Sequence, residues 1–85
     1  MRIYDFNGKK NICGNQIRLA RVRRRMSQSD LAAKMQVEGV ILERDSISRI
    51  EIGTRFVTDY ELLTFAKVLN TDLGRLLADG DDVDA

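Results

Sequence analysis

The clearest structural signal in the sequence is the stretch "TDYE" at residues 58–61, which marks the beginning of a helix. Thr58 and Glu61 have the spacing of a capping box, in which each side chain bonds the backbone N–H of the other residue. Asn70, twelve residues after Thr58, suits a left-handed helix end. The stretch between them predicts one amphipathic helix, because its apolar residues recur at helical spacing, at Leu62, Phe65, Ala66 and Leu69.

Similar signals predict four more helices, so that five short helices account for most of the chain. Ser27 is a good N-cap with Asp30 in the following turn, Gly53 suits a left-handed stop, and Thr71 is expected to cap the last helix. The expected segments are residues 16–24, 28–35, 44–51 or 44–52, and a short fifth helix that holds Leu73, Leu76 and Leu77.

The connection "QVEGVILE" at residues 36–43 is unusually apolar for a loop. Because Val37, Val40, Ile41 and Leu42 would gain from burial, we expect the connection to fold back over the core. With this connection included, the chain predicts an all-α fold with short connections and one domain. We place the domain at residues 14–78, with an N-terminal arm at residues 1–13 and an acidic C-terminal tail at residues 79–85.

The composition excludes several classes of protein. The 85 residues include no histidine and one cysteine, Cys13, so a Ser–His–Asp triad, an internal disulfide and a multi-cysteine metal site are excluded. No apolar run approaches the roughly 20 residues that span a bilayer, and the first residues lack the apolar segment of a signal peptide. We therefore expect a cytoplasmic protein that is not an enzyme and uses no metal, cofactor or membrane.

The net charge of +1 conceals an asymmetry along the chain. Residues 1–58 hold 12 Lys and Arg against 6 Asp and Glu, a charge of +6, whereas residues 59–85 hold 2 against 7, a charge of −5. This split fits either a solvated surface with an acidic tail or a cationic face for a polyanion. The run "RVRRR" at residues 21–25 favours the polyanion.

The stretch "RDSISRIE" at residues 44–51 has two different faces when it is helical. Ile47 and Ile50 face inward, and the opposite face carries Arg44, Asp45, Ser48 and Arg49. The major groove of DNA admits a helix of this kind, since arginine makes two hydrogen bonds to guanine and serine bonds several base edges. For Asp45 three interpretations stay open: a bond from a cytosine amino group, a helix cap, or repulsion of phosphate at wrong sites.

Four fragments in order resemble the helix-turn-helix domain of the lambda-repressor/Cro type, the XRE family. They are "IRLAR" (17–21), "SQSDLAAKM" (27–35), "SISRIEIGTR" (46–55) and "ELLTFAKVLNTDLGRLL" (61–77). The resemblance implies a compact five-helix lambda-repressor-like domain that binds double-stranded DNA. It also implies a transcriptional regulator, a repressor that acts by occupying a near-palindromic operator as a homodimer formed in solution or only on DNA. Such a protein is associated with the nucleoid.

The resemblance assigns roles to residues of this sequence. It assigns contacts with DNA bases to Arg44, Asp45, Ser48 and Arg49. Gln28 contacts a phosphate and braces a residue of the recognition helix, and Thr54 and Arg55 grip the DNA backbone. Lys34 is either solvated or a further backbone contact. Arg21 and Glu51 form an ion pair between two helices, which the bare sequence also favours, because a charge near the core persists only when it is paired.

The sequence departs from the family pattern at three places, one of which is the segment before Gly14, which has no counterpart in the minimal domain. The connection before the expected recognition helix is longer than usual, which leaves the tilt of that helix open. Arg25 stands where a glycine is common, and a left-handed arginine there would cost about 1 kcal/mol.

The arm offers apolar residues that the five helices do not explain. Our hypothesis is that Ile3, Tyr4, Phe6 and Ile12 cover Leu19 and Val22, which lie off the main inward stripe of their helix. The cover would form either within the monomer or across a dimer. Cys13 is expected to be a buried small apolar residue, with redox sensing as a minor alternative.

A second class of function also fits the sequence. The chain can be an antitoxin or adaptor-type helical module, whose main role is to bind a protein partner through the arm or the acidic tail.

Overall fold

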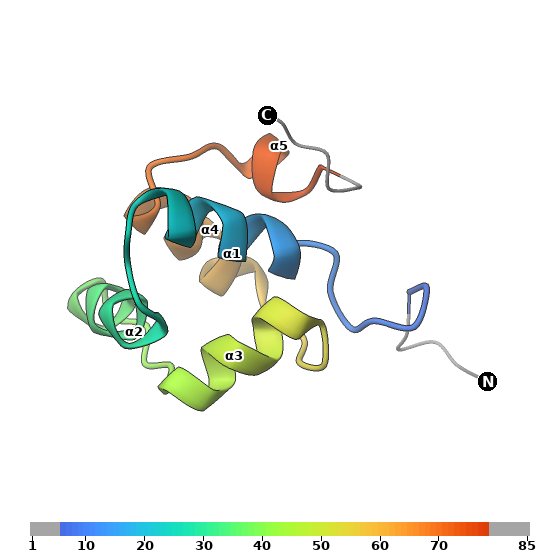
Figure 1. Cartoon of the computed structure of the whole chain (residues 1–85), viewed down its shortest axis with the longest axis horizontal. Helices are drawn as coiled ribbons and strands as arrows, with labels where there is room; N and C mark the ends of the chain where they lie inside the picture. The colour runs from blue at the N-terminus through green and yellow to red at the C-terminus, as the bar shows by residue number, and fades with distance from the viewer. Residues whose placement is uncertain (1–5, 79–85) are drawn as a thin grey trace.

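A computed structural model describes residues 6–78, and this part of the chain folds into five helices and no strand (Figure 1). The all-helical prediction is therefore confirmed for these residues. Helix α1 begins two residues before its predicted start, and α2 continues two residues beyond its predicted end. The helices are α1 (Gly14–Arg23), α2 (Gln28–Val37), α3 (Arg44–Ile52), α4 (Asp59–Val68) and α5 (Leu73–Leu76). Ile3, Tyr4 and the tail at residues 79–85 lie outside the described part.

Side chains cap the beginnings of α2, α4 and α5. Ser27 and Asp30 form a reciprocal capping box at α2, and Thr58 and Glu61 form one at α4. Such a cap satisfies backbone N–H groups that have no partner within the helix. The predicted cap of α5 is wrong by one residue. Asp72, not Thr71, accepts from the backbone of the first turn, because a carboxylate directly precedes the helix.

The four longer helices end in the same way, each followed by a residue with positive φ. Two of these residues are glycines, Gly39 (φ 90°) and Gly53 (φ 89°), and two are Arg25 (φ 57°) and Asn70 (φ 53°). At each end the next backbone N–H reaches back to a carbonyl of the last turn, such as Val40 to Met35 at 3.0 Å. These are Schellman ends, which allow a sharp change of direction after a short helix.

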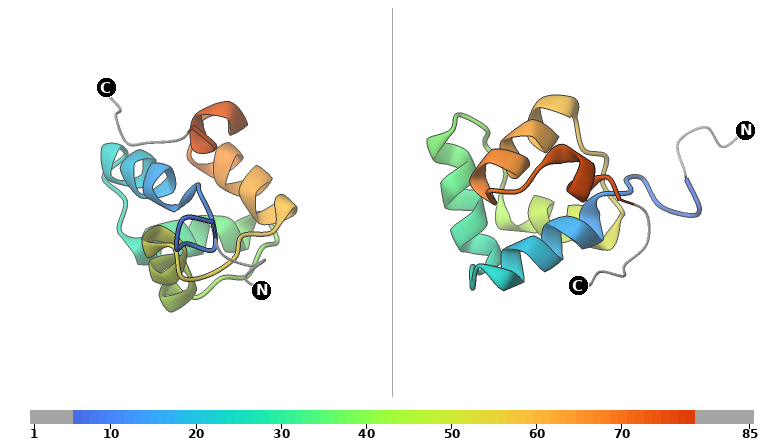
Figure 2. Two further views of the ribbon diagram at one scale, coloured as in Figure 1. Left: turned by 90° about the vertical axis from the view of Figure 1, so that its right-hand side faces the viewer. Right: turned by 90° about the horizontal axis from the view of Figure 1, so that it is seen from above.

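The core lies where α1 crosses α3 and α5, and where α2 packs on α3 and α4 (Figures 1 and 2). Each helix contributes at least one side chain that is fully or almost fully buried. Burying apolar side chains of this size contributes about 1.5–3 kcal/mol each. The largest fully buried ones are Phe65, Ile17, Leu31, Met35, Ile47, Ile50, Leu69 and Leu76.

The connection between α2 and α3 only partly covers the core, which corrects the prediction. Leu42 is buried and Val40 packs against the core. Val37 and Ile41, in contrast, are 83% and 70% exposed. Val37 belongs to the last turn of α2, and the left-handed Gly39 redirects the chain so that alternate residues of the connection face outward.

The expected burial of the fifth helix also holds only in part. Leu76 is buried, whereas Leu73 and Leu77 are more than a third exposed. A helix of one turn has a single residue facing the core. None of the helices in residues 6–78 is long and apolar enough to cross a membrane.

Candidate nucleic-acid interface

The inner side of α3 is anchored by a charged network as well as by apolar packing. Glu51 accepts from Arg21 Nε at 2.7 Å and Nη2 at 3.1 Å, so the predicted ion pair is present. The glutamate side chain is 2% exposed and the arginine side chain 14%. A carboxylate this deeply buried requires its partners, because an unpaired charge there would be strongly destabilising.

Two further bonds complete this network. Gln28 Nε2, in the first turn of α2, donates to Glu51 Oε1 at 3.1 Å. Arg21 Nη1 donates to the backbone carbonyl of Met26 at 2.7 Å, in the connection between α1 and α2. Three helices are therefore joined at one carboxylate, and the expected bracing of α3 by Gln28 is present.

The opposite side of α3 carries the four side chains that were expected to contact bases. Arg44, Asp45 and Arg49 are exposed and Ser48 is partly exposed. Arg44 lies 3.6 Å from Asp45, but both side chains are largely in water. An exposed pair of this kind contributes at most about 1 kcal/mol, so either residue is available to another partner.

The loop after α3 holds Thr54 and Arg55, which were predicted to contact the DNA backbone. The two residues differ in whether their side chains are already bonded within the protein. Thr54 is exposed, with its hydroxyl 3.4 Å from the carbonyl of Arg49. Arg55 instead donates to Glu61 at 3.1 and 3.3 Å and to the carbonyl of Phe56. Burial raises the pKa of Glu61, but the bonds from Arg55 and Thr58 outweigh it and hold that pKa below its usual range. Arg55 thus fastens the loop to α4.

Lys34 lies apart from this surface. It borders a shallow depression with Val37, Glu38 and Val68, on the side of α2 that faces α4. The structure therefore does not bring Lys34 together with the outer face of α3.

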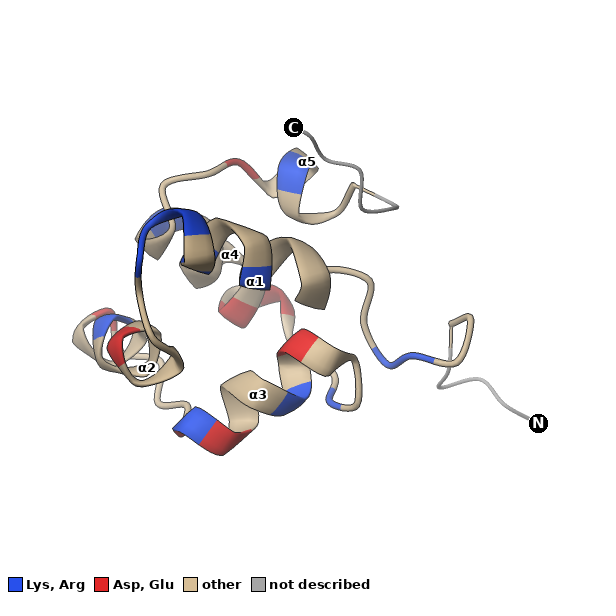
Figure 3. Cartoon of the chain, viewed as in Figure 1, with Lys and Arg blue, Asp and Glu red and all other residues tan. Residues whose placement is uncertain are grey.

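The basic run lies at the end of α1 and in the connection that follows (Figure 3), and its side chains have different partners. Arg21 is taken up by Glu51, and Arg24 Nη2 donates to the carbonyl of Asn70 at 3.0 Å. Arg23 and Arg25 are exposed. These arginines supply a positive field over α1 and not a single cluster on α3.

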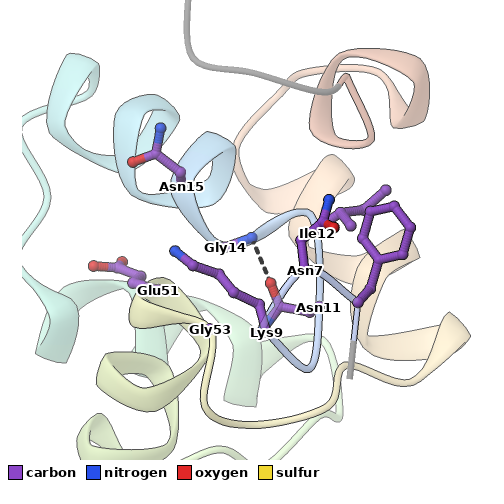
Figure 4. A pocket seen from close by; sticks show the side chains of 9 residues that line it. Asn7, Lys9, Asn11, Ile12, Gly14, Asn15, Glu51 and Gly53 are labelled. Atoms are coloured by element: carbon purple, nitrogen blue, oxygen red, sulfur yellow. Dashed lines mark hydrogen bonds between the residues drawn. The ribbon is translucent and has the colours of Figure 1, made fainter. Parts of the chain in front are cut away.

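Within one chain, the described part of the arm leaves Val22 of α1 uncovered, so the hypothesis is wrong for coverage within the monomer. Coverage across a dimer stays a prediction. Val22 is 52% exposed, and Phe6 and Ile12 are also exposed. The arm packs against the end of α3 instead (Figures 2 and 4). Lys10 N donates to the carbonyl of Gly53 at 2.8 Å, because the turn before it directs the backbone there.

Sequence reasoning missed Asn11, which joins three segments of the described part of the chain. Its Nδ2 donates to the carbonyls of Ile50 at 3.0 Å and Arg55 at 2.8 Å. Its Oδ1 accepts from Gly14 N at 2.8 Å, at the beginning of α1. Cys13, and not Asn11, directly precedes α1 and makes no side-chain capping bond, so the usual pattern of a helix start did not point to Asn11.

Cys13 is buried, as expected, and burial raises the pKa of its thiol to about 11. A thiol held in this state is a poor nucleophile at neutral pH. Among residues 6–78 no three His, Cys, Asp or Glu residues lie together in a way that could hold a metal ion. Comparison of the chain with family models, with curated proteins and with solved structures finds no match.

Proposed function

We propose that this chain is a lambda-repressor-like helix-turn-helix protein that binds double-stranded DNA at specific sequences. The observation that carries the proposal is the division of α3 into two faces. One face is fixed to α1 and α2 through Ile47, Ile50 and Glu51, and the other presents Arg44, Ser48 and Arg49 to water. A rigidly held helix with outward guanidinium and hydroxyl groups suits the major groove.

The beginning of α2 supports the same proposal. Gln28 lies in the first turn of that helix, where backbone N–H groups favour an anion such as a phosphate. Gln28 is partly exposed, and Thr54 lies exposed on the loop that follows α3. Contacts of this kind fix the register of a protein on the duplex, while the side chains of α3 would read the bases.

The proposed mode of action is occupancy of an operator. A homodimer, formed in solution or on DNA, would place two α3 helices about 34 Å apart, one duplex turn, on a near-palindromic site. Occupancy of such a site near a promoter would make the protein a repressor, acting in the cytoplasm on the nucleoid.

Selection from a random duplex library, followed by sequencing, tests this proposal. It should be carried out at about 0.15 M salt, where non-specific phosphate binding is weak. We expect a near-palindrome with half-sites about ten base pairs apart. A library returned without enrichment would contradict sequence-specific binding.

The exposed apolar side chains of the arm favour a second candidate. Phe6 and Ile12 are 56% and 43% exposed. They suit an antitoxin or adaptor-type module that binds a protein partner there. The discriminating result is a partner that co-purifies with the wild-type chain and is lost when both residues are replaced by serine.

A further inference from the structure

We propose that Asn11 is a positioning residue for α3, because its one amide group joins the beginning of α1 to the end of α3 and to the loop beyond. The consequence for DNA rests on the proposed function. The contact that Asn11 makes between α1, the end of α3 and the following loop, here called the joint, exists in the free protein and is tested without DNA.

The bonds of Asn11 use both of its functional atoms. Nδ2 donates to the carbonyls of Ile50 and Arg55, which lie 39 and 44 residues further along the chain. Oδ1 accepts from Gly14 N, as Figure 4 shows. The first carbonyl belongs to the last turns of α3 and the second to the loop that holds Thr54. Asn11 therefore fixes the end of α3 and the loop in relation to α1.

Neighbouring residues of the arm reinforce this joint. Asn7 and Gly8 both have positive φ, 54° and 81°, as in a two-residue hairpin turn. Phe6 and Lys9 close the turn with reciprocal backbone bonds of 2.6 and 3.0 Å. The turn leads directly to Lys10, whose N–H bonds the carbonyl of Gly53. The backbone bonds within this turn therefore fix the conformation of the arm just before it contacts the end of α3.

The backbones of α1 and α3 meet at the same place. A Cβ added to Gly14 would lie 2.1 Å from the carbonyl oxygen of Ile50, so only glycine permits this approach. At the other end of α3, Glu43 makes no side-chain capping bond. The orientation of the outer face therefore depends on the packing of Ile47 and Ile50, on Glu51 at the inner side and on Asn11 at the end of the helix.

A simpler role for Asn11 would be to cap α1, and one substitution separates the two roles. Asn11→Asp keeps an acceptor for Gly14 N–H but removes both bonds to α3 and the loop. Asn11→Ser is a second, uncharged variant whose short side chain cannot span to both carbonyls. Asn15→Asp is the control, because Asn15 is an exposed residue of the same helix start and gains the same charge.

The experiment compares the full-length wild type and these three variants, with circular dichroism confirming that each is folded. Without DNA, we expect amide exchange at Gly53 and Thr54 to accelerate roughly tenfold in Asn11→Asp and Asn11→Ser. Exchange at Leu31 and Leu69 should not change, and Asn15→Asp should behave as the wild type. Unchanged exchange at Gly53 and Thr54 in both Asn11 variants would overturn the inference.

The second readout is the ratio of specific to non-specific DNA affinity on the selected site. We expect this ratio to fall about tenfold in the Asn11 variants, comparable to the loss of one base contact. A purely structural role would lower both affinities together. An unchanged ratio on a site that the wild type selects would overturn the positioning role. If the wild type selects no site, the proposed function fails and amide exchange alone decides on the joint.

Discussion

Arg21 and Glu51 face each other across the junction of α1 and α3, and their side chains join through two hydrogen bonds of 2.7 and 3.1 Å. A second ion pair, Lys67 with Glu38, has the same shortest distance of 2.7 Å but a lysine that is 69% exposed. The first pair is buried, has two bonds between its partners and is joined by Gln28, whereas the second is an exposed lysine with one bond, so one protein contains a strong and a weak ion pair for comparison.

We expect Glu51→Ala to lower the free energy of unfolding by about 3–5 kcal/mol, because it leaves the guanidinium of Arg21 largely buried without its partner. Glu38→Ala should cost at most about 1 kcal/mol, because its partner remains in water. Urea denaturation of both variants provides the comparison. Equal losses would mean that Glu51 is not desolvated as described.

The contact between α1 and α3 gives a second prediction. Gly14→Ala should destabilise the fold by about 1–3 kcal/mol, since the new methyl group would meet the carbonyl of Ile50 and the two helices would have to separate. Gly74→Ala is the control, with its nearest neighbour at 3.4 Å. It should be neutral or stabilising by up to about 1 kcal/mol through helix propensity. Thermal unfolding distinguishes the two, and a neutral Gly14→Ala would refute the close approach.

Arg25 provides a prediction of the opposite sign. Its φ of 57° is unfavourable for a residue with a Cβ, so Arg25→Gly should stabilise the protein by about 0.5–1 kcal/mol. Arg18→Gly removes the same charge from an exposed position within α1 and should destabilise by about 1 kcal/mol. The measurement is the urea midpoint of each variant. A loss of stability in Arg25→Gly would indicate that the arginine side chain itself contributes there.

The carboxylate of Glu61 predicts a dependence of stability on pH. Although burial acts in the other direction, bonds from Arg55 and Thr58 lower its pKa in the folded state. Its contribution is therefore fully present above the unfolded pKa of about 4.3 and is lost as the pH falls through the lower folded value. Between pH 6 and pH 3 we expect Glu61→Gln to lose less stability than the wild type. Glu43→Gln, which removes a carboxylate that makes no side-chain capping bond, is the matched control.

On a selected DNA site, Arg44→Ala and Arg49→Ala should each cost about 1–3 kcal/mol of binding free energy and relax the preference at one base position. Lys34→Ala removes the same charge on the α4 side of α2 and should change affinity little. Titrations against the selected site and against scrambled DNA measure the loss of binding free energy and the change in sequence preference. A uniform loss in the Arg44 and Arg49 variants would place the outer face of α3 against phosphates and not bases.

The helix ends were the most predictable part of the fold, because each depends on residues within one turn. Thr58 and Glu61 lie three residues apart, and Gly53 and Asn70 adopt positive φ as expected. Asp72 displaced Thr71 as the cap of α5 because two adjacent residues compete for the same backbone N–H, and propensity alone does not decide between them.

The pair Arg21–Glu51 was also predictable, although it spans 30 residues. Each residue lay beside an apolar stripe, and a charge in that position requires a partner. The exposure of Val37 and Ile41 was not predictable from their apolarity, since burial depends on the direction in which Gly39 turns the chain. The bonds of Asn11 were missed for a related reason: its acceptors are backbone carbonyls, which every residue carries, so the sequence does not distinguish them.

The two faces of α3 also bear on how such a protein could change its target. Ile47, Ile50 and Glu51 hold the helix in place, and none of them reaches the outer surface. Arg44, Ser48 and Arg49 form no bond that supports the core through their side chains. Substitutions at these outer positions should therefore be tolerated by the fold. Under the proposed function, a library randomised there can be screened for DNA preference without selecting for stability at the same time.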